Sequence, residues 1–300
     1  FYGSGASMQT ACLGLFLDPA YEGDGLKIQE VIKRGPFAVR DTKVQAGDII
    51  EAIDGQRIVA GQDYNQLLDG KVGRPVRITL KGGRDVTVKA ISRSEQNDLL
   101  YRRWVDRNKA MVDKWSGGQV AYVHVKAMNS DSYREVFSEL LSDSNRQKKA
   151  VIVDERHNGG GWLHDDLCTL LSGQQYQSFM PRGQFIGWDP WNKWVKPSCV
   201  LVCEDDYSNG HGFPYVYQKL GIGPVIGAPM AGTMTAVWWE TMLDGQTVFG
   251  IPQVGCMGMD GKYGENQTLT PDITVYNSPE QQLSGDDQQL HRAVEEMMKK

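Results

Sequence analysis

The sequence of 300 residues predicts a mainly-β domain followed by an α/β domain built on a mainly parallel sheet. Three observations predict this. Residues 12–94 contain many short β-prone segments and one helical stretch, whereas residues 119–300 alternate apolar strands with helices. Residues 95–118 lie between them and are charged, with apolar residues at helical spacing, which predicts a connecting helix. Strands that alternate with helices are typical of parallel sheets buried on both faces.

The elements of the first domain are bounded by Gly, Asp and Pro turns. The expected strands are LGLFLD (13–18), GLKIQEVI (25–32), AGDIIEAIDGQRI (46–58), PVRITL (75–80) and RDVTVKAI (84–91). Asp54-Gly55 is the expected hairpin turn, and residues 62–68 form the helical stretch.

The second domain begins with the strand QVAYVHV (119–125) and ends with the amphipathic helix DDQQLHRAVEEMMKK (286–300). Between them we expect the strands KAVIVDE (149–155) and SCVLVCE (198–204), and helices within 130–143, 162–173 and 213–220. The aromatic segment 186–197 is an expected ordered loop that walls a cleft.

Composition excludes several classes of protein. A formal charge of −5 and a pI near 5.6 argue against a nucleic-acid binder, and no apolar run is long enough to span a bilayer. The five cysteines form no CxxC pair, and the five histidines form no HxxxH or HExxH motif. Cys199 and Cys203 lie too far apart along one strand for a disulfide. We therefore expect free thiols, no metal and no cofactor.

Ser208 lies on a turn between an apolar strand and a helix, in the stretch CEDDYSNGHGFPY (203–215). Such a turn can expose a hydroxyl at a helix N-terminus, where developing negative charge is stabilised. Two interpretations stay open at this point: Ser208 is a helix N-cap, or it is a catalytic nucleophile.

A second strand end carries the loop Asn158-Gly159-Gly160-Gly161. Glycines at a strand-to-helix turn let backbone N–H groups face an oxyanion or a phosphate, although simple backbone accommodation is the alternative. The loop lacks the Walker Lys-Ser/Thr pair and the GxGxxG spacing, so nucleotide binding is weakly supported. Because parallel strands end at one edge of a sheet, Gly160 and the Asn209 amide are expected to hold an oxyanion beside Ser208.

Glu265 follows on a loop within GKYGENQTLTPDITVY (261–276). It is either a solvated glutamate or a carboxylate that orients a histidine or holds a serine.

Residues 25–58 (GLKIQEVIKRGPFAVRDTKVQAGDIIEAIDGQRI) resemble a PDZ domain. PDZ domains add a peptide as a strand and capture its carboxylate with backbone N–H groups. The resemblance places the capturing loop at Ala11 to Gly14, with Cys12, Leu13 and Gly14 as peptide-binding residues. The alternative is a packing unit whose groove the rest of the protein fills.

The stretches DERHNGGGWLHDDL, EDDYSNGHGFPYVYQKLGIGPVIG and GENQTLTPDITV resemble tricorn-type serine proteases of the tail-specific protease family. The resemblance implies a ClpP/crotonase-like catalytic domain with Ser208 as the nucleophile. It implies an oxyanion hole from the amides of Asn209 and the glycine loop, with Gly160 as the preferred donor, and a Ser-His-Ser-Glu tetrad that contains Glu265. It also implies a peptide or unfolded polypeptide substrate, a homo-oligomer and an upstream β-propeller.

This chain departs from the family pattern in two places. Asn209 stands where the family has Asp, which matters little if the backbone N–H acts. The tetrad histidine is absent: either Ser7-Met8 is the Ser-His pair with its histidine lost, or the pair lies upstream of Phe1 and residues 1–11 are a remnant of that helical region. His211 and His157 are expected beside the site in supporting roles, and no lysine between Leu220 and Thr241 provides a Ser-Lys variant.

Three functions are therefore weighed. A serine peptidase is the leading hypothesis, a non-catalytic PDZ-containing peptide-binding protein is the alternative, and a crotonase-type acyl-CoA enzyme is the third. Asp165, Asp166 and Glu240 are candidate specificity charges, with solvated acids as the simpler interpretation. The sequence leaves an exported and a cytoplasmic location of bacterial type both open.

Overall fold

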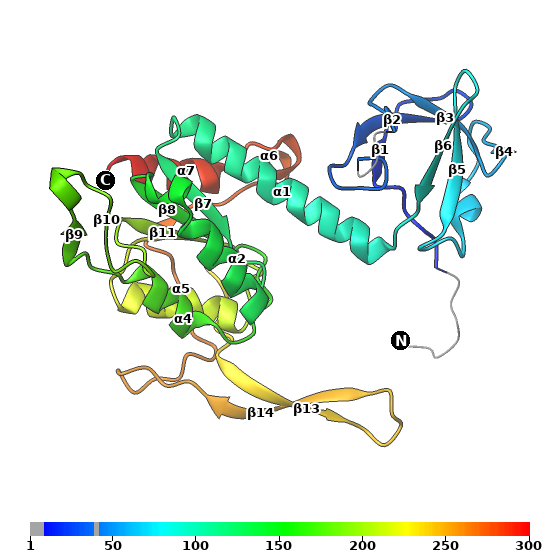
Figure 1. Cartoon of the computed structure of the whole chain (residues 1–300). Coiled ribbons are helices and arrows are strands. Elements are labelled where there is room, and N and C mark those ends of the chain that lie inside the picture. The colour runs from blue at the N-terminus through cyan, green and yellow to red at the C-terminus, as the bar shows by residue number, and fades with distance from the viewer. Residues whose placement is uncertain (1–8, 39–41) are drawn as a thin grey trace. The chain divides into compact units, whose positions relative to one another are not determined.

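The computed structural model describes residues 9–38 and 42–300 (Figure 1). The chain divides into two compact units, Phe1–Arg107 and Asn108–Lys300. The long helix α1 (Arg93–Trp115) crosses the boundary between them. The Ser7-Met8 pair and most of the expected N-terminal remnant lie outside the described residues.

The first unit contains an antiparallel sheet with the strand order β1-β2-β3-β5-β6, and β4 pairs with β3. Its elements are β1 (Leu15–Leu17), β2 (Leu26–Val31), β3 (Ile49–Ile53), β4 (Gln56–Arg57), the 3₁₀ helix η1 (Tyr64–Leu68), β5 (Pro75–Leu80) and β6 (Arg84–Lys89). Val76, Ile78 and Leu80 alternate into the core along β5, which is the pattern of a half-buried strand. The mainly-β fold of this unit is confirmed.

In the loop expected to capture a peptide carboxylate, the amides of Cys12 and Gly14 are engaged within the unit. Cys12 N–H donates to the Ile91 carbonyl at 2.7 Å, and Gly14 N–H donates to Gln96 Oε1 at 3.1 Å. Leu13 is buried in the core of the unit. The N–H groups of Cys12 and Gly14 thus already have acceptors in the same unit. The loop nevertheless lines a pocket of about 120 Å³ together with residues of β1 and η1, so peptide binding here stays a prediction.

The second unit is built on a five-stranded sheet in which every pair is parallel, with the order β15-β12-β11-β8-β7. The strands are β7 (Val120–His124), β8 (Ala150–Asp154), β11 (Ser198–Val202), β12 (Val225–Gly227) and β15 (Ile273–Thr274). β8 and β11 are buried along their whole length, as expected for the centre of a sheet covered on both faces. The predicted α/β architecture is confirmed.

Helices cover both faces of this sheet (Figure 1). They are α2 (Ser130–Leu140), α3 (Asp143–Arg146), α4 (His164–Leu171), α5 (Asn209–Lys219), α6 (Pro279–Ser284) and α7 (Gln288–Met298). α2, α4 and α5 share one apolar core with Val151 and Val153 of β8. α7 packs on the opposite face, where buried Arg156 pairs with Asp154 at 2.7 Å and with Asp287, the N-cap of α7, at 2.8 Å.

Two hairpins extend from the unit. The first contains β9 (Gln177–Phe179), the 3₁₀ turn η2 (Pro181–Gly183) and β10 (Gly187–Asp189); the second pairs β13 (Thr235–Thr241) with β14 (Val248–Gly255) and reaches far from the sheet (Figure 1). The expected aromatic loop 186–197 starts in β10 and packs on the domain, with Trp194 only 2% exposed. None of the described helices is long and apolar enough to cross a bilayer.

Candidate active site

The carboxyl ends of β8 and β11 open onto a cavity of about 730 Å³, a volume typical of ligand sites. The loop that follows β8 contains Asn158 to Gly161, and the loop that follows β11 ends at Ser208. The cavity is lined by Gly159, Gly161, Tyr207, Ser208, Thr233, Thr235, Ala236, Val237, Trp239, Gly250, Pro252 and Glu265. The two loops therefore meet where the parallel-strand rule places them.

Ser208 occupies a strained backbone conformation, with φ 57° and ψ −119°. A non-glycine residue with positive φ costs about 1–3 kcal/mol and persists only where the surroundings impose it. Its N–H donates to Thr233 Oγ1 at 2.7 Å. Ser208 is the N-cap residue of α5, yet its side chain makes no capping hydrogen bond. The interpretation as a helix cap therefore fails, because the hydroxyl lies at the cavity without capping the helix.

Asn158 holds the two loops together. Its carbonyl accepts from Tyr207 N–H at 2.9 Å, and its own N–H donates to Asp206 Oδ1 at 3.0 Å. Its side-chain amide donates to the Val125 carbonyl at 2.9 Å. Asp206 is buried, and burial raises the pKa of this carboxyl to about 7. These bonds fix the glycine loop against the turn before Ser208.

Gly160 packs directly on the serine turn. A Cβ at this position would lie 2.6 Å from Ser208 Cβ and 2.8 Å from the Tyr207 carbonyl oxygen, and φ is +95°. Its N–H, however, donates to Asn158 Oδ1 at 2.8 Å. Within the described ranges, the N–H groups of Gly159, Gly161 and Asn209 have no hydrogen-bond acceptor. Gly160 therefore lets the glycine loop pack closely on the serine turn, and the N–H groups without an acceptor belong to its neighbours.

The Asn209 side chain links the two helices that start at the site. Its Oδ1 accepts from Leu163 N–H at 2.7 Å and from His164 N–H at 3.1 Å, which caps the first turn of α4. Its Nδ2 lies 2.8 Å from His164 Nδ1. An amide oxygen satisfies these N–H donors as a carboxylate would, so asparagine is compatible with this position.

Glu265 lines the same cavity as Ser208. Its Oε2 accepts from Thr235 N–H, the first residue of β13, at 2.8 Å. The structure thus brings this carboxylate to the site from a loop far along the sequence.

None of the histidines in the described part of the chain lines the cavity. His211 is only 1% exposed; burial lowers its pKa, and the nearby charge of Glu265 partly opposes that effect. His157 pairs with Asp205 at 3.0 Å, and its backbone N–H donates to Cys203 Sγ. His157 thus joins the glycine loop to the loop that follows β11, whereas the supporting role expected for His211 stays a prediction.

The β13–β14 hairpin forms one wall of the cavity. From the sequence, the segment 186–197 is the expected wall, but none of its residues lines the cavity. Val237, Trp239, Gly250 and Pro252 lie on it, and Trp239 is 67% exposed. The signal for this hairpin is present in the sequence, since apolar residues flank Asp244-Gly245, a typical hairpin turn. By contrast, none of the candidate specificity charges Asp165, Asp166 and Glu240 is among the cavity residues.

Comparison with known proteins assigns both units. Residues 119–275 match the family model described as peptidase family S41, and residues 18–93 match the one described as the tricorn protease PDZ domain. The tricorn protease of Thermoplasma acidophilum is 29% identical over 257 residues, which cover 84% of this chain and 24% of that protein. Tricorn protease homolog 1 of Streptomyces coelicolor is 28% identical over 267 residues, 87% of this chain and 25% of that protein.

A crystal structure of the tricorn protease has the same fold, with a TM-score of 0.86 at 24% identity over 97% of this chain and 29% of that one. The chain therefore spans about a quarter of the length of these relatives.

Proposed function

The chain belongs to peptidase family S41, and on this premise we propose that it carries the serine-peptidase site of a larger enzyme. The observation that carries the proposal is the environment of Ser208. Its backbone is strained, its hydroxyl makes no capping hydrogen bond, and it lines a cavity together with the glycine loop and Glu265. Strain of this kind is expected where function requires it.

In the proposed reaction, Ser208 Oγ attacks the carbonyl carbon of a peptide bond and forms a tetrahedral intermediate. The N–H groups of Asn209 and Gly161 stabilise its oxyanion, and loss of one such donor costs about 10²–10³ in rate. The leaving amine takes the proton that the serine lost, and water then hydrolyses the acyl-enzyme by the same route.

We propose that the general base is a histidine supplied from outside these 300 residues. What supports this is that none of the described histidines lines the cavity. Glu265 lies at the cavity with one oxygen held by Thr235 N–H. We assign it to holding that histidine, directly or through a second serine, in the tetrad of the family.

The substrate is a peptide or an unfolded segment, held along the β13–β14 hairpin by apolar contacts with Val237 and Trp239. The full-length enzyme is a homo-oligomer with a β-propeller upstream of this sequence. Both statements rest on the resemblance to tricorn-type proteases.

Hydrolysis of a fluorogenic peptide amide by the full-length protein tests the proposal. Ser208→Ala should reduce kcat by several orders of magnitude, on the order of 10⁶, as for other serine nucleophiles. Ser284→Ala, on the exposed helix α6, is the control and should retain activity. Equal activity of Ser208→Ala and the wild type would exclude Ser208 as the nucleophile.

A further inference from the structure

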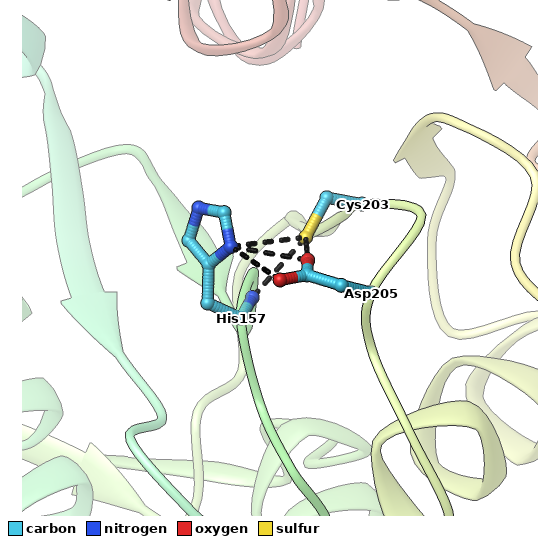
Figure 2. Close-up of side chains that lie close together, drawn as sticks. All are labelled: His157, Cys203 and Asp205. Carbon is cyan, nitrogen blue, oxygen red and sulfur yellow. Dashed lines mark hydrogen bonds and ion pairs between the residues drawn. The ribbon is translucent and has the colours of Figure 1, made fainter.

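Three potential metal ligands meet beside the candidate active site: His157, Cys203 and Asp205. His157 follows β8, whereas Cys203 and Asp205 follow β11, its neighbour in the parallel sheet. Figure 2 shows the three side chains pointing toward one another from these two loops. The cluster is invisible as a sequence motif because its members come from strand ends that only the fold brings together.

The ligand atoms form a compact triangle. His157 Nδ1 lies 3.0 Å from Asp205 Oδ1, Cys203 Sγ lies 2.8 Å from the same oxygen, and Sγ and Nδ1 are 3.8 Å apart. Zinc binds thiolate sulfur at ~2.3 Å and imidazole nitrogen or carboxylate oxygen at ~2.0–2.2 Å, so tetrahedral ligand atoms lie ~3.3–3.6 Å apart. The Asp205 oxygen must therefore move away from Sγ and Nδ1 by about 0.5–0.8 Å to reach these spacings.

The ligand set has the chemistry of a zinc site. Thiolate and imidazole select zinc and related transition metals, whereas calcium and magnesium require oxygen ligands. Cys203 is buried and fixed, while the side chains of His157 and Asp205 are 57% and 67% exposed. An ion held by these three groups keeps a fourth position open to solvent.

The surrounding charge also favours a cation. Glu204, which is exposed, precedes Asp205 in the sequence. Arg156, the residue before His157, directs its guanidinium to Asp154 and Asp287. Its positive charge is therefore balanced by these two carboxylates.

We propose that His157 Nδ1, Cys203 Sγ and the Asp205 carboxylate bind a zinc ion. The Cys203 thiol loses its proton to solvent when the metal binds, and its sulfur then bonds to zinc in place of donating to Asp205. The ion links two loops: the loop after β8, which contains Gly159–Gly161, and the loop after β11, which ends at Ser208. It stabilises their contact and takes no part in peptide hydrolysis.

Cobalt(II) titration of the metal-free full chain tests the site, because thiolate bound to cobalt gives an intense near-ultraviolet charge-transfer band. The band should appear with the wild type and with the control Cys256→Ser, a partly exposed cysteine of the same unit outside the cluster, and it should be lost in Cys203→Ser. The thermal transitions of the metal-free variants show whether each one folds. If Cys203→Ser does not fold, His157→Ala replaces it, since that side chain is largely exposed; this variant keeps the thiolate and should need at least about tenfold more cobalt(II) to develop the band.

Competition with a chromophoric chelator then measures zinc affinity. His157→Ala and Asp205→Asn should each weaken zinc binding at least about tenfold. Absence of the band, its persistence in Cys203→Ser, or unchanged zinc affinity in both His157→Ala and Asp205→Asn would overturn the proposal.

Discussion

Replacing Gly160 by alanine should disable the site while leaving most of the fold intact. The added Cβ would lie 2.6 Å from Ser208 Cβ, whereas carbon atoms in contact lie about 3.5–4.0 Å apart, so the serine turn must move by roughly 1 Å. A misplacement of about 1 Å can cost on the order of 10² in rate. The positive φ of +95° adds about 1–3 kcal/mol of backbone strain.

Gly159→Ala is the matched control, because a Cβ there meets no heavy atom within 4 Å and needs no positive φ. The assay measures kcat for a fluorogenic peptide amide with the full-length protein, and the free energy of unfolding by urea. We expect Gly160→Ala to lose about 10²-fold in kcat and about 1–3 kcal/mol in stability, with Gly159→Ala near the wild type in stability. Wild-type values of both quantities for Gly160→Ala would refute the close approach of these loops.

Three further predictions concern stability and substrate binding. Arg156→Ala leaves the buried carboxylate of Asp154 without its cation and should lower the free energy of unfolding by about 3–5 kcal/mol in urea, whereas a loss well below that would show that the pair is not essential. Burial lowers the pKa of His211 below its usual 6.5, so the unfolded chain binds the extra proton and stability falls as the pH drops through that value. In the His211→Gln variant, the free energy of unfolding should therefore differ less between about pH 7.5 and about pH 5.5 than in the wild type. An unchanged difference would contradict the lowered pKa of His211. Trp239→Ala should raise KM about fivefold, equivalent to about 1 kcal/mol of lost apolar contact, with a smaller effect on kcat; an unchanged KM would remove the hairpin from the substrate site.

The spacing of apolar residues predicted both folds well, because the burial of each strand determines which of its positions are apolar. The alternation of Val76, Ile78 and Leu80 and the continuous apolar run of β8 are direct consequences of one-sided and two-sided burial. A different rule, that parallel strands end at one edge of a sheet, placed Ser208 and the glycine loop together. The β13–β14 hairpin was missed although its Asp244-Gly245 turn is visible in the sequence, because its apolar residues face the cavity and solvent where a core was sought.

The finer assignments at the site depend on local hydrogen bonds that the sequence does not specify. Gly160 was preferred over its neighbours as the oxyanion donor, but the Asn158 side chain accepts its N–H and leaves those of Gly159 and Gly161, which line the cavity. The Cys12 amide was likewise expected to be open and instead donates to Ile91. In both cases a competing acceptor from the chain itself decides which amides remain for a ligand.

Fluorophosphonate labelling followed by peptide mapping tests the central claim most directly. We expect Ser208 to be labelled in the full-length protein and to stay unlabelled in the 300-residue chain, because we propose that the histidine that activates it is supplied from outside this sequence. Absence of label at Ser208 in the full-length protein would contradict the assignment of this residue as the nucleophile.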